Sequence, residues 1–385
     1  MKKFKIIVYL LACIFHLSAL AQESKSFSSL NSTYEKGLEL YQKGMYADAQ
    51  KTFEQYMVKL PQGYHQQRVS AEFYRAMCAI ALNNSDAEYL IGQFIQNYPE
   101  SQLIDQAYFG MGKMQYQQKK YTQAVYWLTK IDKNGLEKDT RFEWQFMLGY
   151  CYFMTNDYEA ANRWFYQIKD IDNIFAAPAT YYYSHIAYLQ KKYATALKGF
   201  EKLQNDELFA PLVPYYITHI YYLQSDYGKV TTYSPRLAKD NTNKRAPEIA
   251  KIVGDAFFKL KQFDSSLAYL KIYEEKNKQQ LSREDLYLLG FAYYKNAKYT
   301  EASKYLERIA TVDDSLSQNA NYHLADCYLK LNNKNKARQA FGLASKLDFD
   351  KVIKEDALFN FAKLTYEQLY APFNEAIDAF NAYIK

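Results

Sequence analysis

The feature that most constrains this chain is an internal repeat. An aromatic residue followed three positions later by a small one recurs along the sequence, as in Tyr121 with Ala124 and Tyr299 with Ala302. The small residue occupies positions 49, 87, 124, 161, 196, 230, 266, 302, 337 and 376, so consecutive copies lie 34 to 39 residues apart. A period in this range is typical of repeat architectures, in which each unit packs mainly on its neighbours.

A second position of the repeat, the glycine slot, lies twelve residues before the small residue. It holds Gly37, Gly112, Gly149, Gly254 and Gly290, and in three other copies Ser184, Thr218 and Ala325. Glycine inside a helix costs about 1 kcal/mol relative to alanine, so its recurrence indicates that a second helix approaches closely. A large apolar residue four positions after the small one shares its helix face. Each unit is thus predicted to be a hairpin of helix A, with the glycine slot, and helix B, with the small residue.

The composition supports an all-α fold. The chain has 385 residues, of which 49% are hydrophobic and 23% charged, so it can bury a large core. It contains only 13 Gly and 8 Pro, too few for the many tight turns of a β-sandwich, barrel or propeller. Long helices are the remaining option.

The repeat closely resembles the tetratricopeptide repeat, whose signature runs large, small and aromatic in helix A, then alanine and aromatic in helix B. The residues that carry the resemblance best are Leu289, Gly290, Tyr293, Ala302 and Leu306. The resemblance covers about residues 30–385 and implies a right-handed superhelical solenoid of about ten helical hairpins. It implies little about function, because this scaffold is reused for many tasks.

Two irregularities predict the domain organisation. In repeat six, Val230 replaces the small residue and Pro235 falls inside helix B, and a polar stretch then leads to Pro247. We therefore expect two sub-solenoids, residues 22–235 and 247–385, joined by residues 236–246. The sequence also stops inside helix B of repeat ten, where a solenoid needs a solvated cap. We therefore expect the chain to be truncated or to continue in its parent protein.

The first residues resemble a signal peptide. Lys2, Lys3 and Lys5 precede an apolar run over residues 6–20 that ends in a small-x-small pattern. This pattern predicts a signal peptide at residues 1–21, cut after Ala21, and hence a protein of the periplasm or outer membrane. The apolar run is too short to span a membrane. The alternative is a lipidated Cys13, which would leave an unusually short apolar region.

The charge of the mature chain argues against nucleic acid as a partner. Removing residues 1–21 takes away three lysines, so 48 − 3 = 45 basic residues face 42 acidic ones. A net charge of +3 (45 − 42) without long basic runs is unlike a nucleic-acid-binding surface.

The sequence predicts no enzyme, no cofactor and no metal. It contains no phosphate-binding loop, no zinc-protease motif, no nucleophile elbow and no Cys-x-x-Cys. The mature cysteines, Cys78, Cys151 and Cys327, lie in apolar helical patterns and are expected to be buried free thiols. His185 and His219 occupy equivalent repeat positions, but no further ligand completes a metal site around them.

The resemblance places helix A on the concave face, where aromatic residues recur four after, one after and three before the glycine slot. We call these recurring residues the aromatic ladder, and they are densest in repeats four to six. There we predict that a partner binds to Tyr150, Phe153, Tyr181, His185, Tyr188, Tyr215, His219 and Tyr222. Tyrosine suits recognition because it buries a large area and keeps a hydroxyl group for hydrogen bonding. The alternative is that these rings only fill the space between adjacent A helices.

These observations predict an exported, non-catalytic scaffold of the bacterial cell envelope. Its partner would be an envelope protein or a peptide segment, and the mature chain would contain no transmembrane span. Two alternatives remain: a surface module that binds glycan through the same aromatic residues, and a structural spacer. The tripeptide Asp314-Ser315-Leu316 resembles a bacterial O-glycosylation sequence, but we interpret it as a helix-capping turn.

Overall fold

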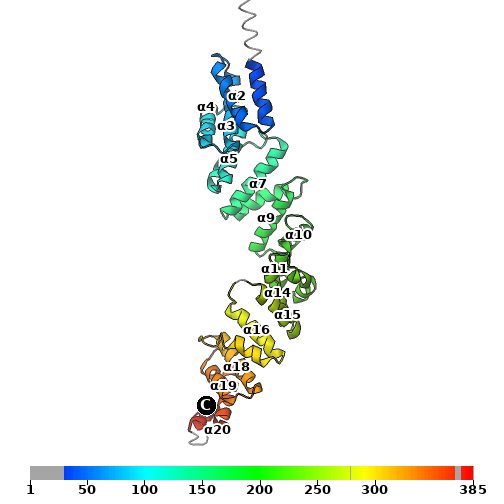
Figure 1. The fold of residues 1–385 in the computed structure, drawn as a ribbon, viewed down its shortest axis with the longest axis vertical. Coiled ribbons are helices and arrows are strands. Elements are labelled where there is room, and N and C mark those ends of the chain that lie inside the picture. Colours follow the sequence, from blue (N-terminus) through cyan, green and yellow to red (C-terminus); the bar gives the residue numbers. More distant parts are fainter. Residues whose placement is uncertain (1–29, 278, 369–373, 385) are drawn as a thin grey trace, which may run out of the picture. The chain divides into compact units, whose positions relative to one another are not determined.

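The computed structural model describes residues 30–277, 279–368 and 374–384, and every regular element in these ranges is a helix (Figure 1). The signal peptide predicted at residues 1–21 lies outside them. The chain divides into two compact units, residues 1–186 and 187–385, and the division falls inside helix α9. The joint predicted at residues 236–246 therefore lies within the second unit, and its role as a boundary between sub-solenoids stays a prediction.

The first unit begins with a helix over residues 30–42. Seven further helices complete it up to the dividing helix: α2 (Tyr46–Lys59), α3 (His65–Ala81), α4 (Ala87–Asn97), α5 (Ile104–Gln117), α6 (Tyr121–Leu128), α7 (Lys138–Met154) and α8 (Tyr158–Ile168). The dividing helix is α9 (Ala176–Leu189).

The second unit continues the same pattern of paired helices. Its elements are α10 (Tyr193–Lys202), α11 (Val213–Leu223), α12 (Tyr227–Tyr233), α13 (Pro235–Lys239), α14 (Ala246–Lys259), α15 (Phe263–Lys276), α16 (Arg283–Lys295), α17 (Tyr299–Leu306), α18 (Ser315–Lys330), α19 (Lys334–Lys346), α20 (Lys351–Gln368) and α21 (Asn374–Ile384). Neighbours in sequence pack together as hairpins, for example α14 with α15 and α18 with α19. The predicted all-α fold of helical hairpins is confirmed, and the handedness of the superhelix stays a prediction.

The glycine slot works as the sequence predicts, because helix B packs directly on it. A Cβ atom added to Gly149 would lie 2.7 Å from a ring carbon of Phe165, and one added to Gly290 would lie 2.9 Å from Leu306. Both partners are the large residue four positions after the small one, and both are fully buried. A side chain at Gly149 or Gly290 would therefore push the two helices of that hairpin apart.

The hairpin turns share one geometry. From α5 onward, the residue seven positions after the glycine slot adopts a left-handed conformation, with φ between 56° and 64°. The next N–H then donates to the carbonyl five residues earlier, as Lys120 does to Gln115 and Lys298 to Tyr293. This is the Schellman ending, which satisfies carbonyl groups that the last turn of a helix leaves free.

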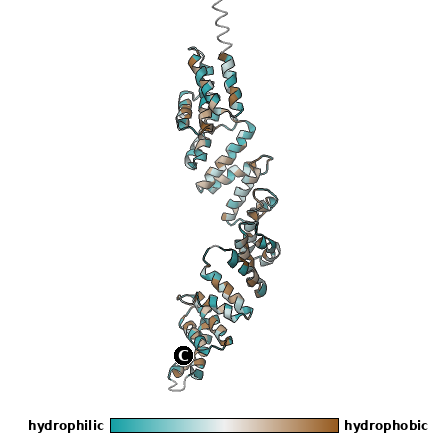
Figure 2. Cartoon of the chain, in the orientation of Figure 1, coloured by the Kyte–Doolittle hydropathy of each residue, from teal (hydrophilic) through white to brown (hydrophobic). Residues whose placement is uncertain are grey.

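Each helix has one buried stripe, so hydrophobic and hydrophilic residues are mixed along the helices of both units (Figure 2). Cys78, Cys151 and Cys327 lie in these buried stripes as free thiols, as predicted. Within the ranges that the structure describes, no helix combines the length and the apolar character needed to cross a membrane.

Repeat six departs from this plan. Its helix B consists of two short helices, α12 and α13, which meet at Ser234. Ser234 stands where other repeats have a large apolar residue, and Thr218 stands in the glycine slot. The two buried hydroxyl groups lie 2.7 Å apart and form a hydrogen bond. Residues 240–245 then lead without a helix to α14.

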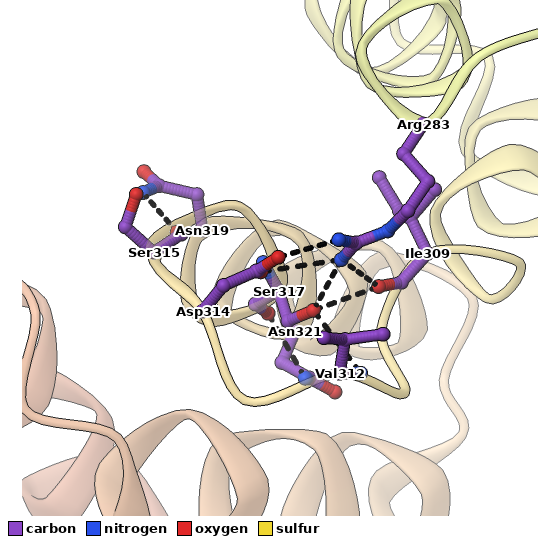
Figure 3. A network of polar contacts seen from close by, with 8 residues as sticks. All are labelled: Arg283, Ile309, Val312, Asp314, Ser315, Ser317, Asn319 and Asn321. Atoms are coloured by element: carbon purple, nitrogen blue, oxygen red, sulfur yellow. Dashed lines mark hydrogen bonds and ion pairs between the residues drawn. The ribbon is translucent and has the colours of Figure 1, made fainter.

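The turn before α18 is a cap, as predicted for Asp314. The Asp314 carboxylate accepts a hydrogen bond of 2.7 Å from the backbone N–H of Ser317 and pairs with the Arg283 guanidinium at the start of α16 (Figure 3). Arg283 also donates to the Ile309 carbonyl at 3.1 Å. The pKa of Asp314 is held well below its usual range by the hydrogen bonds that its carboxylate accepts. Those from Arg283 have the largest effect, followed by those from Ser317. The cap thus also ties two successive A helices together.

Candidate functional site

The predicted aromatic ladder connects successive A helices. The residue four after a glycine slot contacts the residue one after the next slot. In the second unit the Tyr294 hydroxyl donates to the Asp326 carboxylate at 2.7 Å, and Tyr222 donates in the same way to Asp255. Where the contact is purely aromatic, two rings meet, as Tyr116 and Tyr150 do with centroids 5.6 Å apart in the first unit. The ladder therefore has a structural role between repeats, whatever else it binds.

Four of the predicted binding residues lie in the first unit and form one cluster. They are Tyr150, Phe153, Tyr181 and His185. The cluster centres on Tyr182, whose ring lies 5.2 Å from Tyr150 and 5.1 Å from Phe153. His185 joins it through Phe153, at 5.8 Å, and burial lowers the pKa of its imidazole.

Sequence reasoning missed Tyr182, although a signal for it exists. It lies two positions before the slot residue Ser184, and Tyr216 has the equivalent place in the next repeat. In the first unit, Tyr182 stacks on Phe165 of the preceding helix B with an interplanar angle of 18°. In the second unit, Tyr216 stacks on Phe200 in the same way, with an angle of 14°. This third aromatic position packs one repeat on the next.

The other four predicted residues, Tyr188, Tyr215, His219 and Tyr222, lie in the second unit. Three of them meet: the Tyr188 hydroxyl is 2.6 Å from Nδ1 of His219, and His219 stacks on Tyr215 with ring centroids 5.8 Å apart. Burial lowers the pKa of His219, so its imidazole is neutral at pH 7. Tyr222 takes no part in this group, because its hydroxyl is bound to Asp255.

Beside Tyr215 and His219 lies an open cavity of about 1000 Å³, which we call the joint groove. It is formed by α11, by the non-helical residues after α13, and by the first turns of α14 and the end of α15. Its walls consist of Tyr215, His219, Asp240, Asn241, Asn243, Lys244, Ala246, Pro247, Glu248, Lys251, Ile252, Tyr273, Lys276, Asn277 and Gln279. The groove therefore follows directly from the break in repeat six, which leaves residues 240–245 outside any helix.

An ion pair between an exposed lysine and a buried carboxylate supports one wall of the joint groove. The Lys251 ammonium lies 2.6 Å from the carboxylate of Asp285, whose side chain is only 4% exposed. The Tyr273 hydroxyl donates to the same carboxylate at 3.0 Å. Burial raises the pKa of Asp285, but these two groups and the backbone N–H of Ser282 outweigh it and hold the pKa below its usual value. Lys251 is thus fixed in place, and Tyr273 presents its ring beside it.

The remaining charges of the joint groove are of both signs. Glu248 lies in the wall and pairs at 3.2 Å with Arg245, which does not line the groove and whose guanidinium lies 4.9 Å from the ring centre of Tyr215. Lys244, Lys276 and Asp240 also line the groove. An aromatic floor with amides and fixed charges around it suits an extended peptide, which offers backbone groups and side chains together.

Sequence reasoning missed Tyr273, Lys251 and Asp285. Tyr273 lies seven positions after the small residue, where most other repeats have Ile or Leu, such as Ile168 and Ile309. That exchange of an aliphatic for an amphipathic residue was a readable signal. Within the part of the chain that the structure describes, no three His, Cys, Asp or Glu side chains gather as metal ligands would.

The comparisons with known proteins agree with the repeat architecture. The sequence model of the family described as outer membrane lipoprotein matches residues 28–120, and that of anaphase-promoting complex (cyclosome) subunit 3 matches residues 270–344. A search of curated proteins finds no significant match.

Solved tetratricopeptide repeat structures are also similar to this chain. YrrB, described as having an unusual peptide-binding site, has 18% identity and a TM-score of 0.40, over 47% of this chain and 91% of its own. The C-terminal part of a repeat protein from Cytophaga hutchinsonii has 13% identity and a TM-score of 0.43, over 70% and 98%. The P58(IPK) domain has 16% identity and a TM-score of 0.30, over 89% and 100%. Similarity at this level does not assign a function.

Proposed function

Because the chain belongs to the tetratricopeptide repeat family, we propose that it is a non-catalytic scaffold of the bacterial cell envelope that holds a protein partner in the joint groove. Proteins of this fold generally mediate protein–protein interactions, for which solenoids provide extended concave surfaces. The observation that carries the proposal is the joint groove itself. It is large enough for a peptide segment, and its walls include Tyr215 and His219, two of the binding residues that the sequence predicts.

Two observations support a location in the envelope. The match of residues 28–120 is to a family described as outer membrane lipoproteins. The sequence before it has the basic start, the apolar run and the small-x-small ending of a secretory signal. We propose the periplasm or the outer membrane surface as the place of action.

The partner is expected to be an extended segment with aromatic or apolar anchors. Tyr215 and Tyr273 provide rings beside the cations of Arg245 and Lys251, and Asn241 and Gln279 provide amides for backbone groups. All eight predicted binding residues remain proposals, and Tyr188, His219 and Tyr222 also take part in links between repeats.

The test is affinity capture from envelope extract with residues 22–385 as bait, followed by titration of the captured protein. We expect Tyr215→Ala combined with His219→Ala to weaken binding at least about tenfold, because anchor residues carry most of the energy of an interface. Lys244→Ala with Lys276→Ala removes two lysine charges from the walls but keeps the aromatic residues, so it should weaken binding less.

Tyr89→Ala is the matched control, since this tyrosine is 66% exposed, belongs to the first unit and does not line the joint groove. Equal affinity of the groove variant and the control variant would refute the assignment of the groove. Thermal melting of each variant separates loss of binding from loss of folding.

A further inference from the structure

A second recess lies in the first unit, between the start of α3 and the segment that joins α4 to α5. Its volume is about 670 Å³, within the range of roughly 300–1000 Å³ that is usual for small-molecule sites. Its walls consist of His65, Gln66, Val69, Ser70, Asn97, Tyr98, Pro99, Glu100, Ser101, Gln102 and Leu103. We call it the amide recess, because three of its side chains are carboxamides.

The charges of the two recesses differ strongly. The joint groove has five charged side chains in its walls, three lysines and two acidic residues, whereas Glu100 is the one carboxylate of the amide recess. No lysine or arginine lines the amide recess. An anionic ligand would therefore find no counter-charge there and would be repelled by Glu100, so the recess favours a ligand without negative charge.

The polar groups of the amide recess are available for a ligand. Among the described residues, the side-chain amides of Gln66, Asn97 and Gln102 make no hydrogen bond, and all three side chains are exposed. Each amide offers two N–H donors and a carbonyl acceptor. Such groups match hydroxyl groups, which also donate and accept at once.

An aromatic wall completes the amide recess. The ring of Tyr98 is held against buried Phe94, with centroids 5.4 Å apart, and the imidazole of His65 lies 5.7 Å from it on the other helix. Burial, and then the nearby Glu72 carboxylate, raise the pKa of Tyr98, so its hydroxyl keeps its proton at neutral pH. A fixed amphipathic ring next to free amides suits a molecule with apolar C–H faces and hydroxyl edges.

We propose that the amide recess binds a neutral oligosaccharide. This site is independent of the joint groove and of the aromatic ladder, and it does not rest on the proposed scaffold function. The sugar ring would lie against Tyr98 and His65, and its hydroxyl groups would bond to Gln66, Asn97 and Gln102. Weak affinity is expected, with a dissociation constant on the order of 0.1–1 mM, because the recess is open and the amides must become ordered.

The test is saturation-transfer NMR and calorimetry on the full chain with maltotetraose, cellotetraose and the tetramer of N-acetylglucosamine. We expect at least one of them to bind. The double variant Asn97→Ala, Gln102→Ala should weaken that binding at least about tenfold, since each lost hydrogen bond costs about a factor of five. His65→Ala should weaken it as well.

The matched control is Gln67→Ala with Gln96→Ala. These exposed amides lie on the same two helices, next to Gln66 and Asn97, but outside the recess. Unchanged binding in the control, with loss in the recess variant, supports the proposal. Three results would overturn it: no binding of any of the sugars, equal weakening by both double variants, or binding of neutral tetraalanine in place of the sugars.

Discussion

Two hairpins of the second unit show what one slot of the repeat controls. In α16–α17, Gly290 faces fully buried Leu306, and the two helices close on each other. In repeat six, Thr218 and Ser234 replace this pair, helix B breaks into α12 and α13, and the joint groove opens beside the break. A polar pair at the glycine slot and the large apolar position can therefore mark where a solenoid has a cavity for a ligand.

The largest loss of stability should come from removing a buried side chain in the regular hairpin α16–α17. Leu306→Ala removes a fully buried side chain and should cost about 2–5 kcal/mol of local stability, whereas Ser234→Ala removes one hydrogen bond and should cost about 1 kcal/mol. Hydrogen–deuterium exchange in α16–α17 and in α11–α12 measures both. Similar losses in the two variants would mean that the polar pair packs as tightly as the glycine pair.

Lowering the pH should reduce the stability of the regular repeats around His323 more than that of the repeats around the joint groove. His323 lies among Phe291, Tyr294 and Tyr322, with ring centroids 4.7, 5.2 and 5.4 Å away. Burial and then the nearby Lys295 lower its pKa to about 4. Its folded pKa is thus below the unfolded value of about 6.5, so the folded state binds fewer protons and loses stability as the pH falls from about 6.5 to about 4.

We expect the loss at His323 to be about 2 kcal/mol, allowing for partial exposure, and His323→Gln to remove this part of the pH dependence. Denaturation midpoints between pH 7 and pH 4, with NMR titration of the histidine rings, provide the measurement. The pKa of His219 is also lowered by burial. We expect acid to affect stability more through His323 than through His219. A lower pKa for His219 than for His323 in the NMR titration would contradict this.

The hydroxyl links between A helices should contribute less. Tyr294→Phe removes the bond to Asp326, and Tyr222→Phe removes the bond to Asp255 next to the joint groove. Each should lower stability by about 1 kcal/mol, because a carboxylate loses one donor. Exchange rates in α14 and α18 report the two losses separately. No change from Tyr222→Phe would show that the joint is held by other contacts.

The smallest effect is expected at the thiols. Cys78, Cys151 and Cys327 are buried, and burial raises the pKa of each to about 12. Since the thiolate is the reactive form, none should react with a thiol reagent at pH 8 until the chain unfolds. Rapid native labelling of any one of them would show that its repeat opens.

The pairing of helices could be predicted from the sequence because Gly290 and Leu306 lie at fixed offsets that recur in several other hairpins. The contact partner of each ladder residue could not be predicted. That partner lies one position after the next glycine slot, where the residue type changes from His219 to Asp255 to Phe291. The joint groove was also hidden, since its walls come from a non-helical stretch and from Tyr273, which repeat periodicity assigns to the core. A helix-breaking residue such as Pro235 indicates where a groove lies, but it does not predict which side chains line it.

The links between A helices also make the order of the repeats matter. The hydroxyl groups of Tyr222 and Tyr294 find their acceptors, Asp255 and Asp326, in the repeat that follows. If one repeat, residues 254–289, were deleted in register, Tyr222 would face Phe291 and its hydroxyl would lose its acceptor. Repeats of this chain are therefore not interchangeable modules, and an engineered shortening must cut where the new neighbours still match.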